Sequence, residues 1–191
     1  MSQPRTVAVI VGSLRKDSVS RKVARALEAL TPNLKFTEIP IGDLQLFNQD
    51  LEATPTAEWV AFRQKIQAAD AVLFVTPEYN RSVPGALKNA IDVASRPYGA
   101  SAWNGKPGAV ISVSPGGIGG FGANHHLRQS LVFLNVPVLS SEAYIGAAYA
   151  LFDENGELIN EGTAEFLKAY GQAFSAWIDK IIGEQTVQKA A

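Results

Sequence analysis

The sequence predicts an α/β fold in which a parallel sheet of five strands is covered by helices on both faces. Short apolar runs, rich in Val and Ile, alternate along the chain with amphipathic stretches of helical periodicity. Two of these runs, residues 7–11 and 71–75, are apolar throughout, as expected for strands that are buried on both faces. Strands separated by helices imply parallel pairing through right-handed crossovers.

The other strands have weaker patterns. The expected strands are residues 7–11, 34–39, 71–75, 108–113 and a last strand that begins at 136–139. Residues 34–39 alternate apolar and polar side chains, which is typical of an edge strand. Pro137 has no N–H to donate to a neighbouring strand, so the last strand is also expected at an edge.

Each helix is expected from an apolar stripe at helical spacing. The side chains expected to be buried are Val23, Leu27 and Leu30; Trp59, Phe62 and Ile66; Leu87, Ile91 and Ala94; Leu127, Leu131 and Leu134; and Phe166, Tyr170, Phe174, Trp177 and Ile181. Thr54 is the expected cap of the second helix, with Pro55 in its first turn, and Ser82 is the expected cap of the third. The last helix is expected over 163–182, followed by a frayed tail at 183–191.

The chain length of 191 residues suits one domain, so residues 1–191 are expected to form a single unit. This length favours the strand order 2-1-3-4-5, which is the order of flavodoxin-like folds. In such sheets, ligands bind beyond the carboxyl ends of the strands, where the strand order reverses. The loops after the first, third and fourth strands are therefore expected to meet at one site. We call them the first loop (12–21), the second loop (76–84) and the third loop (114–122).

Composition excludes several classes of function. The net charge is −1 and no basic block occurs, so the chain lacks the electrostatic pattern of nucleic-acid binding. It contains no cysteine, which excludes disulfides, thiolate nucleophiles and cysteine-based metal sites. His125 and His126 are adjacent and cannot share one helix face, so no metal site is expected. No signal peptide or membrane-spanning run is visible, which predicts a cytoplasmic protein.

The first loop has the features of an anion site. Ser13, Ser18 and Ser20 supply hydroxyls, Arg15 supplies a cation, and a helix N-terminus with free N–H groups follows. The loop lacks G-x-G-x-x-G and G-K-S/T, so neither a dinucleotide nor a nucleoside triphosphate site is expected here. A terminal monophosphate, such as that of FMN, fits this pattern. A simple turn with a helix cap is the alternative.

The second loop combines two prolines with free backbone groups at a strand end. Tyr79 offers an aromatic wall, and Asn80 can both donate and accept hydrogen bonds. The edge of a flavin ring, which alternates acceptors with one N–H, is a ligand that such a backbone can bind. A capped turn before the third helix is the other interpretation, and the two do not exclude each other.

The third loop contains five glycines between Gly116 and Gly122. Each glycine costs conformational entropy on folding, so this density indicates more than a turn. Close approach of the backbone to a flat ligand would explain it, with N–H groups directed at the ring oxygens. A flexible loop is the alternative.

Two motifs together resemble a known family. They are Gly-Ser-Leu-Arg-Lys-Asp-Ser at residues 12–18 and the run from Pro77-Glu78-Tyr79-Asn80 through Asp92. In this order and at this spacing, the chain resembles the NADPH-dependent FMN reductase family. It is most similar there to bacterial quinone reductases, which are also described as chromate reductases and are related to azoreductases. The resemblance extends over nearly the whole chain, up to the final helix.

The resemblance implies a flavodoxin-like fold that holds FMN non-covalently. By this resemblance, the residues that hold the FMN phosphate are Ser13, Arg15, Ser18 and Ser20; those that line the isoalloxazine and ribityl side are Pro77, Glu78, Tyr79 and Asn80; and those at the ring edge are Ser114, Gly116 and Gly117. It also implies a homodimer or homotetramer. Two roles for Arg81 stay open: pairing with a neighbouring subunit, and contact with the phosphate of the nicotinamide cofactor.

The implied activity is an NAD(P)H-dependent oxidoreductase. A hydride would pass from NADPH or NADH through bound FMN to a quinone or a similar small two-electron acceptor, azo compounds and chromate included. No side chain is expected to be catalytic, because the cofactor carries the chemistry. One alternative is a flavodoxin-type electron carrier, although a net charge of −1 argues against it. Another is a reductase that supplies free reduced FMN to a monooxygenase.

Overall fold

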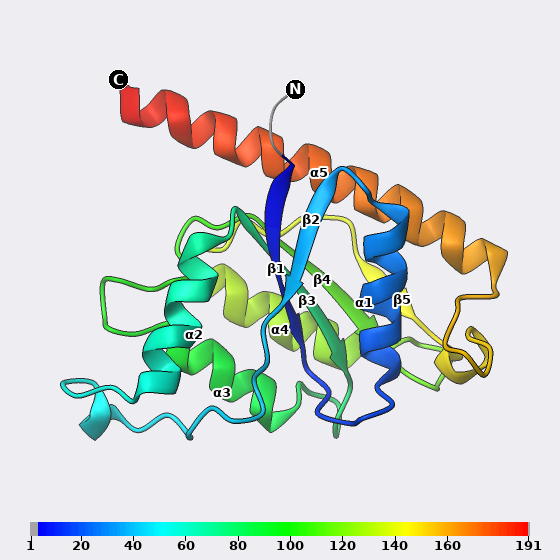
Figure 1. Ribbon diagram of the computed structural model, residues 1–191, viewed down its shortest axis with the longest axis horizontal. Coiled ribbons are helices and arrows are strands. Elements are labelled where there is room, and N and C mark those ends of the chain that lie inside the picture. The colour runs from blue at the N-terminus through cyan, green and yellow to red at the C-terminus, as the bar shows by residue number, and fades with distance from the viewer. Residues whose placement is uncertain (1–3, 191) are drawn as a thin grey trace.

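A parallel five-stranded sheet forms the centre of the computed structural model, which describes residues 4–190 (Figure 1). The strands are β1 (Arg5–Val11), β2 (Leu34–Glu38), β3 (Ala71–Pro77), β4 (Gly108–Val113) and β5 (Ala143–Ile145). Their order across the sheet is β2-β1-β3-β4-β5, and every neighbouring pair is parallel. The predicted flavodoxin-like topology is therefore confirmed.

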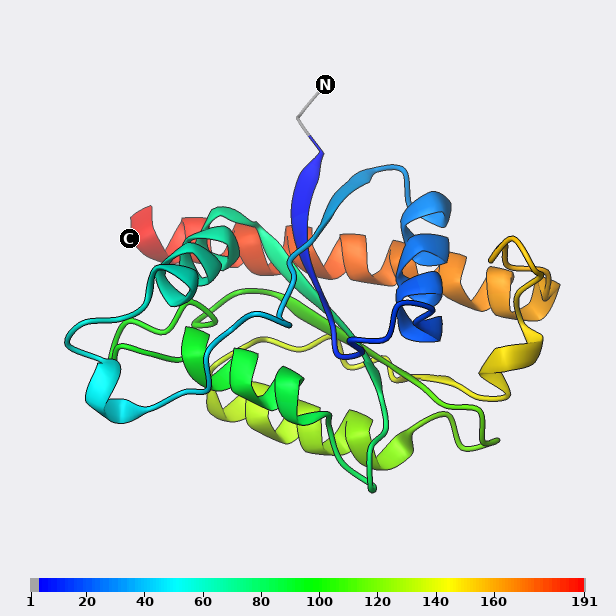
Figure 2. The ribbon, with the colours of Figure 1, turned by 60° about the horizontal axis from the view of Figure 1, so that its bottom comes forward.

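Helices cover both faces of the sheet. They are α1 (Val19–Leu30), α2 (Ala57–Ala68), α3 (Gly85–Ala94), α4 (Phe121–Phe133) and α5 (Glu161–Ala190). One core joins α1 and α5 to a face of the sheet, and a second core joins α2, α3 and α4 to the other face. Figure 2 shows α3 and α4 together on one side and α5 on the other. Alternate residues of β1 enter the two cores, Val9 one and Ile10 the other, as the pleat requires.

Two helices begin later than the sequence predicts. The first residue of α2 is Ala57, and its cap is Thr56, whose hydroxyl accepts a hydrogen bond from the Trp59 N–H (3.3 Å). The expected cap, Thr54, is wrong by two residues. Ser82 is also not a cap, because α3 begins after Pro84 and no side chain caps it.

The last strand lies further along the chain than expected. Residues 136–139 only run beside the start of β4, where Gly108 N–H donates to the Pro137 carbonyl (3.1 Å) and Leu139 N–H donates to the Gly108 carbonyl (2.8 Å). Regular pairing resumes only at β5. Arg128 fills the interruption, since its guanidinium donates to the carbonyls of Leu139 (2.9 Å) and Ser141 (2.7 Å).

The final helix differs in its buried stripe and in its length. Its fully buried side chains are Leu167, Tyr170, Phe174 and Ile178, whereas Phe166 is 41% exposed. The helix continues to Ala190, beyond the expected end at residue 182, and residue 191 lies outside the described residues. Fraying of the tail stays a prediction. Within this extension, Gln185 donates a side-chain hydrogen bond to the Gly105 carbonyl (2.5 Å). No helix in residues 4–190 is both long and apolar enough to cross a membrane.

Candidate active site at the carboxyl edge of the sheet

The first and second loops meet at the carboxyl edge of the sheet, as predicted. Gly12 N–H donates to the Val75 carbonyl (2.9 Å), which joins the end of β1 to the end of β3. A Cβ added at Gly12 would lie 2.8 Å from the Thr76 hydroxyl, so only glycine allows the two strand ends to pack this closely. The third loop lies against the second, because a Cβ at Gly120 would lie 3.5 Å from the Glu78 Cβ.

The first loop holds its three hydroxyls in buried positions. Ser13, Ser18 and Ser20 are 4%, 3% and 2% exposed. Ser18 caps α1 by accepting from the Arg21 N–H (3.2 Å), and Ser13 accepts from the Arg15 N–H (3.4 Å). Each hydroxyl still has its own hydrogen to donate. The Ser20 hydroxyl has no hydrogen-bond partner within residues 4–190, and its oxygen is not one of the fully enclosed unpartnered atoms there, so a ligand can reach it.

Arg21 shapes the first loop, a role that the sequence did not indicate. Its guanidinium pairs with Glu38 (2.8 Å) and donates to the carbonyls of Arg15 (3.0 Å) and Ser13 (3.4 Å). These contacts tie two carbonyls of the loop to the first turn of α1. The sequence places Arg21 three residues after Ser18, at the start of the predicted helix. The carbonyls that Arg21 binds could be identified only from the folded chain.

The second loop contains a tight two-residue turn. Tyr79 and Ser82 exchange both backbone hydrogen bonds (2.9 and 3.0 Å), and the residues between them, Asn80 and Arg81, have φ angles of 52° and 63°. Two consecutive positive φ values are the geometry of a type I′ turn, which is strained for a non-glycine pair. Strained turns cluster at ligand sites. Tyr79 is 46% exposed at this turn, so its ring is accessible.

The Glu78 carboxylate is bound by other groups of the protein. Its carboxylate accepts from the Ala123 N–H (3.1 Å) and pairs with Arg81 (3.0 Å), and only 11% of its side chain is exposed. Gly120 occupies the N-cap position of α4 and has no side chain to satisfy the first-turn N–H groups, so Glu78 supplies this acceptor from another loop. The carboxylate thus ties the second loop to α4.

The glycines of the third loop divide into two groups. A Cβ at Gly119 would lie 2.7 Å from the Tyr144 carbonyl carbon, and one at Gly122 would lie 2.7 Å from the Arg81 carbonyl oxygen, so protein contacts require these two glycines. A Cβ at Gly117 would meet nothing within 4 Å, and one at Gly116 only the Ser114 hydroxyl at 3.6 Å. The protein itself therefore leaves open space at Gly116 and Gly117.

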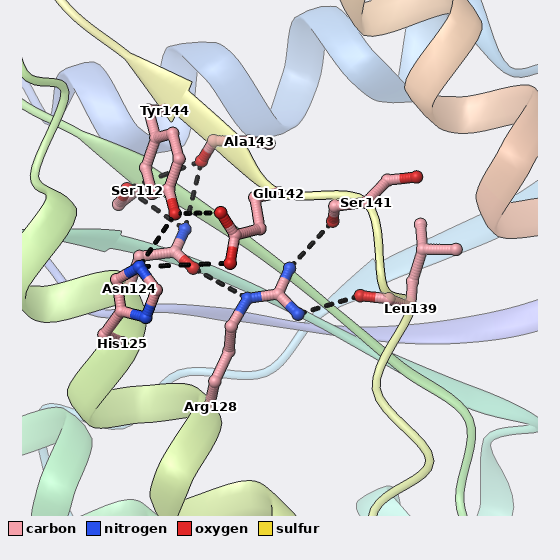
Figure 3. Close-up of polar contacts among 9 residues, drawn as sticks. All are labelled: Ser112, Asn124, His125, Arg128, Leu139, Ser141, Glu142, Ala143 and Tyr144. Carbon is pink, nitrogen blue, oxygen red and sulfur yellow. Dashed lines mark hydrogen bonds and ion pairs between the residues drawn. The ribbon is translucent and has the colours of Figure 1, made fainter.

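Side chains of β4 and α4 hold the third loop, and the polar contacts around Asn124 and Arg128 are drawn in Figure 3. The Ser112 hydroxyl donates to the Gly119 carbonyl (2.7 Å), and the Asn124 amide donates to Ser112 (3.2 Å) and to the Ala143 carbonyl (3.1 Å). Arg128 donates to the Asn124 amide oxygen (2.8 Å). Ser112 and Asn124 are fully buried. The sequence analysis did not identify this network. The i, i+4 spacing of Asn124 and Arg128 was the one sequence feature that could have indicated their contact.

A second polar cluster flanks the loop. The Tyr144 hydroxyl donates to Glu142 and lies 3.0 Å from His125 Nε2 (Figure 3). Burial, together with the hydrogen bond to Glu142, raises the pKa of Tyr144 to about 12. Arg128 and Glu142 do not pair with each other, since each has its own partners. His126 lies 3.0 Å from the Ser82 hydroxyl, and no group of three possible metal ligands occurs within residues 4–190.

The sequence of this chain matches a known protein family. The family described as NADPH-dependent FMN reductase matches residues 5–150, which carry all three loops. This chain belongs to the NADPH-dependent FMN reductase family. The family predicted from the two motifs is thus confirmed.

Relatives of this FMN reductase family member cover almost its whole length. A quinone reductase of Pseudomonas putida is 61% identical over 181 residues, which cover 93% of this chain and 97% of that protein. A 2-hydroxy-1,4-benzoquinone reductase of a Burkholderia species is 44% identical over 174 residues (90% and 95%). The solved structure of FerB from Paracoccus denitrificans, a flavoenzyme NAD(P)H:(acceptor) oxidoreductase, is similar with 45% identity, a TM-score of 0.87 and coverage of 92% and 98%.

The site fits the cofactor of the FMN reductase family. The Ser20 hydroxyl, which has no hydrogen-bond partner within residues 4–190, lies at the first turn of α1, where a phosphate is favoured by free N–H groups. The open space at Gly116 and Gly117 suits the approach of a flat ring. The chain is accordingly an oxidoreductase that uses FMN with NAD(P)H as electron donor.

Proposed function

We propose that this protein is an NAD(P)H-dependent quinone reductase whose FMN binds non-covalently at the carboxyl edge of the sheet. The observation that carries the proposal is that two loops pack against the same second loop. One of them provides a hydroxyl-rich helix N-terminus, and the other provides an open glycine pair. The acceptor class is supported by the quinone reductases of Pseudomonas putida and Burkholderia among the relatives. Azo compounds and chromate remain further candidate acceptors.

The first loop would bind the phosphate end of FMN. Ser13, Ser18 and Ser20 would donate hydroxyl hydrogen bonds, and the N–H groups at the start of α1 would add the favourable end of the helix dipole. Arg15 is exposed and would supply a charge-assisted hydrogen bond. The loop would thus fix one end of the ligand and determine its orientation.

The second and third loops would hold the ring. Pro77, Tyr79 and Asn80 would line the isoalloxazine and ribityl side, with Tyr79 offering its exposed ring. Glu78 would act indirectly, because its carboxylate already holds Arg81 and α4. Ser114, Gly116 and Gly117 would lie at the ring edge. Both roles of Arg81 stay open. Its guanidinium contacts Glu78, but the side chain is 73% exposed and could bind a second anion, either on a neighbouring subunit or on the nicotinamide cofactor.

FMN, when bound, supplies the two-electron chemistry that links the nicotinamide donor to the acceptor. The protein's part is to bind and orient. The backbone N–H of Gly117 would face the ring edge and stabilise negative charge there, whereas the Gly116 N–H already donates to the Ser114 hydroxyl (3.1 Å). No protein side chain is assigned as an acid or base.

The predicted homo-oligomer has one supporting feature. Tyr98 and Phe133 are 89% and 88% exposed, and both line a groove of about 1300 Å³ between α3 and α4. Exposed aromatic side chains gathered in a groove are typical of an interface. A second copy of this chain is the proposed occupant, and light scattering on the purified protein checks it. A cytoplasmic location likewise remains a prediction.

One experiment tests the proposed activity. Protein reconstituted with FMN is mixed anaerobically with NADPH or NADH while the visible absorbance of oxidised flavin is followed. Rapid bleaching that benzoquinone reverses is expected, and the faster nucleotide identifies the preferred donor. Bound flavin that does not bleach would instead indicate an electron carrier. Release of the reduced flavin into a filtrate would indicate a reductase that supplies free reduced FMN.

A further inference from the structure

A turn that follows β5, residues 146–150, completes the edge of the site. Its backbone is fastened to the third loop, because Ala147 and Ala148 N–H donate to the carbonyls of Gly116 (3.4 Å) and Ser114 (3.2 Å). A Cβ at Gly146 would lie 2.7 Å from the Gly117 carbonyl oxygen. Ala147 has a φ of 48°, a left-handed conformation that is strained for alanine and that indicates a position fixed by its surroundings.

Tyr149 projects from this turn to the first loop. Its hydroxyl accepts a hydrogen bond from Arg15 Nη1 (3.2 Å), although the two residues are 134 positions apart in the sequence. The Tyr149 side chain is 62% exposed, so the contact is not a consequence of burial in the core. It connects the predicted phosphate end of the site to the turn that is braced on the third loop.

The partner of Arg15 differs in charge from that of Arg21. Arg21 pairs with a carboxylate, that of Glu38, whereas no carboxylate lies within ion-pair distance of Arg15 in residues 4–190. A phenol orients a guanidinium without neutralising it, so Arg15 keeps its full charge for an anion. The Tyr149 hydroxyl hydrogen also has no acceptor in this part of the chain and can donate to the same anion.

We propose that Tyr149 is a positioning residue for the flavin phosphate. Its hydroxyl holds the Arg15 guanidinium at the mouth of the first loop and makes the site selective for FMN over riboflavin, the same ring without phosphate. The inference rests on the proposed function, since it assigns a role within the proposed FMN site.

The test compares the dissociation constants of FMN and riboflavin for the apo-protein, measured by quenching of flavin fluorescence. Tyr149→Phe keeps the ring and removes the hydroxyl. FMN binding is expected to weaken by about three- to tenfold, in line with the loss of one ordinary hydrogen bond at an exposed position, and riboflavin binding is expected not to change. The melting temperature of the variant should match that of the wild type, because the side chain is exposed.

Two further variants make the result specific. Tyr98→Phe removes a hydroxyl from another exposed tyrosine, in the α3–α4 groove, and should leave both constants unchanged. Arg15→Ala should weaken FMN binding by more than Tyr149→Phe does. Because Tyr149 is proposed to act through Arg15, adding Tyr149→Phe to Arg15→Ala should cause little further loss.

The possible failures are distinguishable. If Arg15→Ala weakens FMN binding while Tyr149→Phe does not, the role of Tyr149 is overturned and the FMN site stands. Equal weakening of FMN and riboflavin by Tyr149→Phe would overturn it too, since the tyrosine would then support the fold of the site. If wild-type protein binds FMN no better than riboflavin and Arg15→Ala changes neither, the proposed phosphate site itself is wrong.

Discussion

The first loop and the third loop lie at the same edge of the sheet but are held in different ways. In the first loop, Ser13 and Ser18 bind N–H groups two and three residues away, and Arg21 binds carbonyls of the same loop. In the third loop, the Gly119 carbonyl is bound by Ser112 on β4, and Gly119 itself packs on Tyr144 of β5. One loop is organised by its own sequence, and the other by its neighbours in space.

This difference explains what each loop offers. Hydroxyls and a helix N-terminus can be prearranged locally for a compact anion. A flat ring needs an extended strip of backbone, and a glycine strip has no side chains with which to fix itself. Residues from β3, β4, α4 and β5 must therefore supply the fixing contacts. Four substitutions or conditions test this comparison, from the largest expected effect to the smallest.

Gly119→Ala should have the largest effect. Its φ of 59° disfavours a side chain, and the new Cβ would lie 2.7 Å from backbone that cannot move aside. We expect a loss of about 3 kcal/mol in the free energy of unfolding, measured by urea denaturation. Gly117→Ala is the matched control, since its Cβ meets nothing within 4 Å, and it should weaken FMN binding without a loss of stability. Equal stability losses in both would contradict the division of the glycines.

Asn124→Leu should come next. The substitution removes the donor to the Ala143 carbonyl and the acceptor for Arg128, and it leaves buried polar groups without partners. A loss of about 2 kcal/mol is expected from urea unfolding curves. The ratio of FMN to riboflavin affinity should stay at the wild-type value, because the first loop does not depend on Asn124. A variant as stable as the wild type would show that the third loop does not need this network.

Arg21→Met should cost less in stability. The Arg21–Glu38 pair is partly exposed (24% and 36%), and such pairs contribute about 1 kcal/mol or less. FMN binding should nevertheless weaken, because the carbonyls of Ser13 and Arg15 lose the group that holds them. Arg25→Met, an exposed position on the same helix, is the control and should change neither quantity. Unchanged FMN affinity in Arg21→Met would show that Arg21 does not organise the first loop for binding.

Alkaline pH should give the smallest effect, and this effect should arise beside the third loop, at Tyr144. The pKa of Tyr144 is raised from 10.0 to about 12, so the folded protein holds this proton more tightly than the unfolded chain does. The associated stabilisation is complete below pH 10 and is lost as the pH rises from 10 to 12. The melting temperature of the wild type should therefore fall more steeply over this range than that of Tyr144→Phe. If the melting temperatures of the two proteins fell in parallel, Tyr144 would not contribute to the pH dependence of stability.

Much of the fold and part of the candidate site could be predicted from the sequence. Continuous apolar runs predicted β1 and β3, and helical periodicity predicted the buried faces of α2 and α4, which carry Trp59 and Leu127. The alternation of strands with helices predicted a parallel sheet, and the chain length favoured its strand order. The stripe of α5 was misplaced because Phe166 and Leu167 are both apolar, and periodicity alone does not decide between adjacent apolar residues.

By itself, the sequence determined the sheet, its order and a hydroxyl-rich first loop, because these features depend on residue spacing and on nearby backbone groups. Only the tertiary structure decided that Glu78 completes α4, that Arg128 closes the gap before β5, and that Tyr149 reaches Arg15. The physical reason is that each of these side chains binds a group distant in the chain. Such a partner acquires a position only after the sheet has brought the strand ends together.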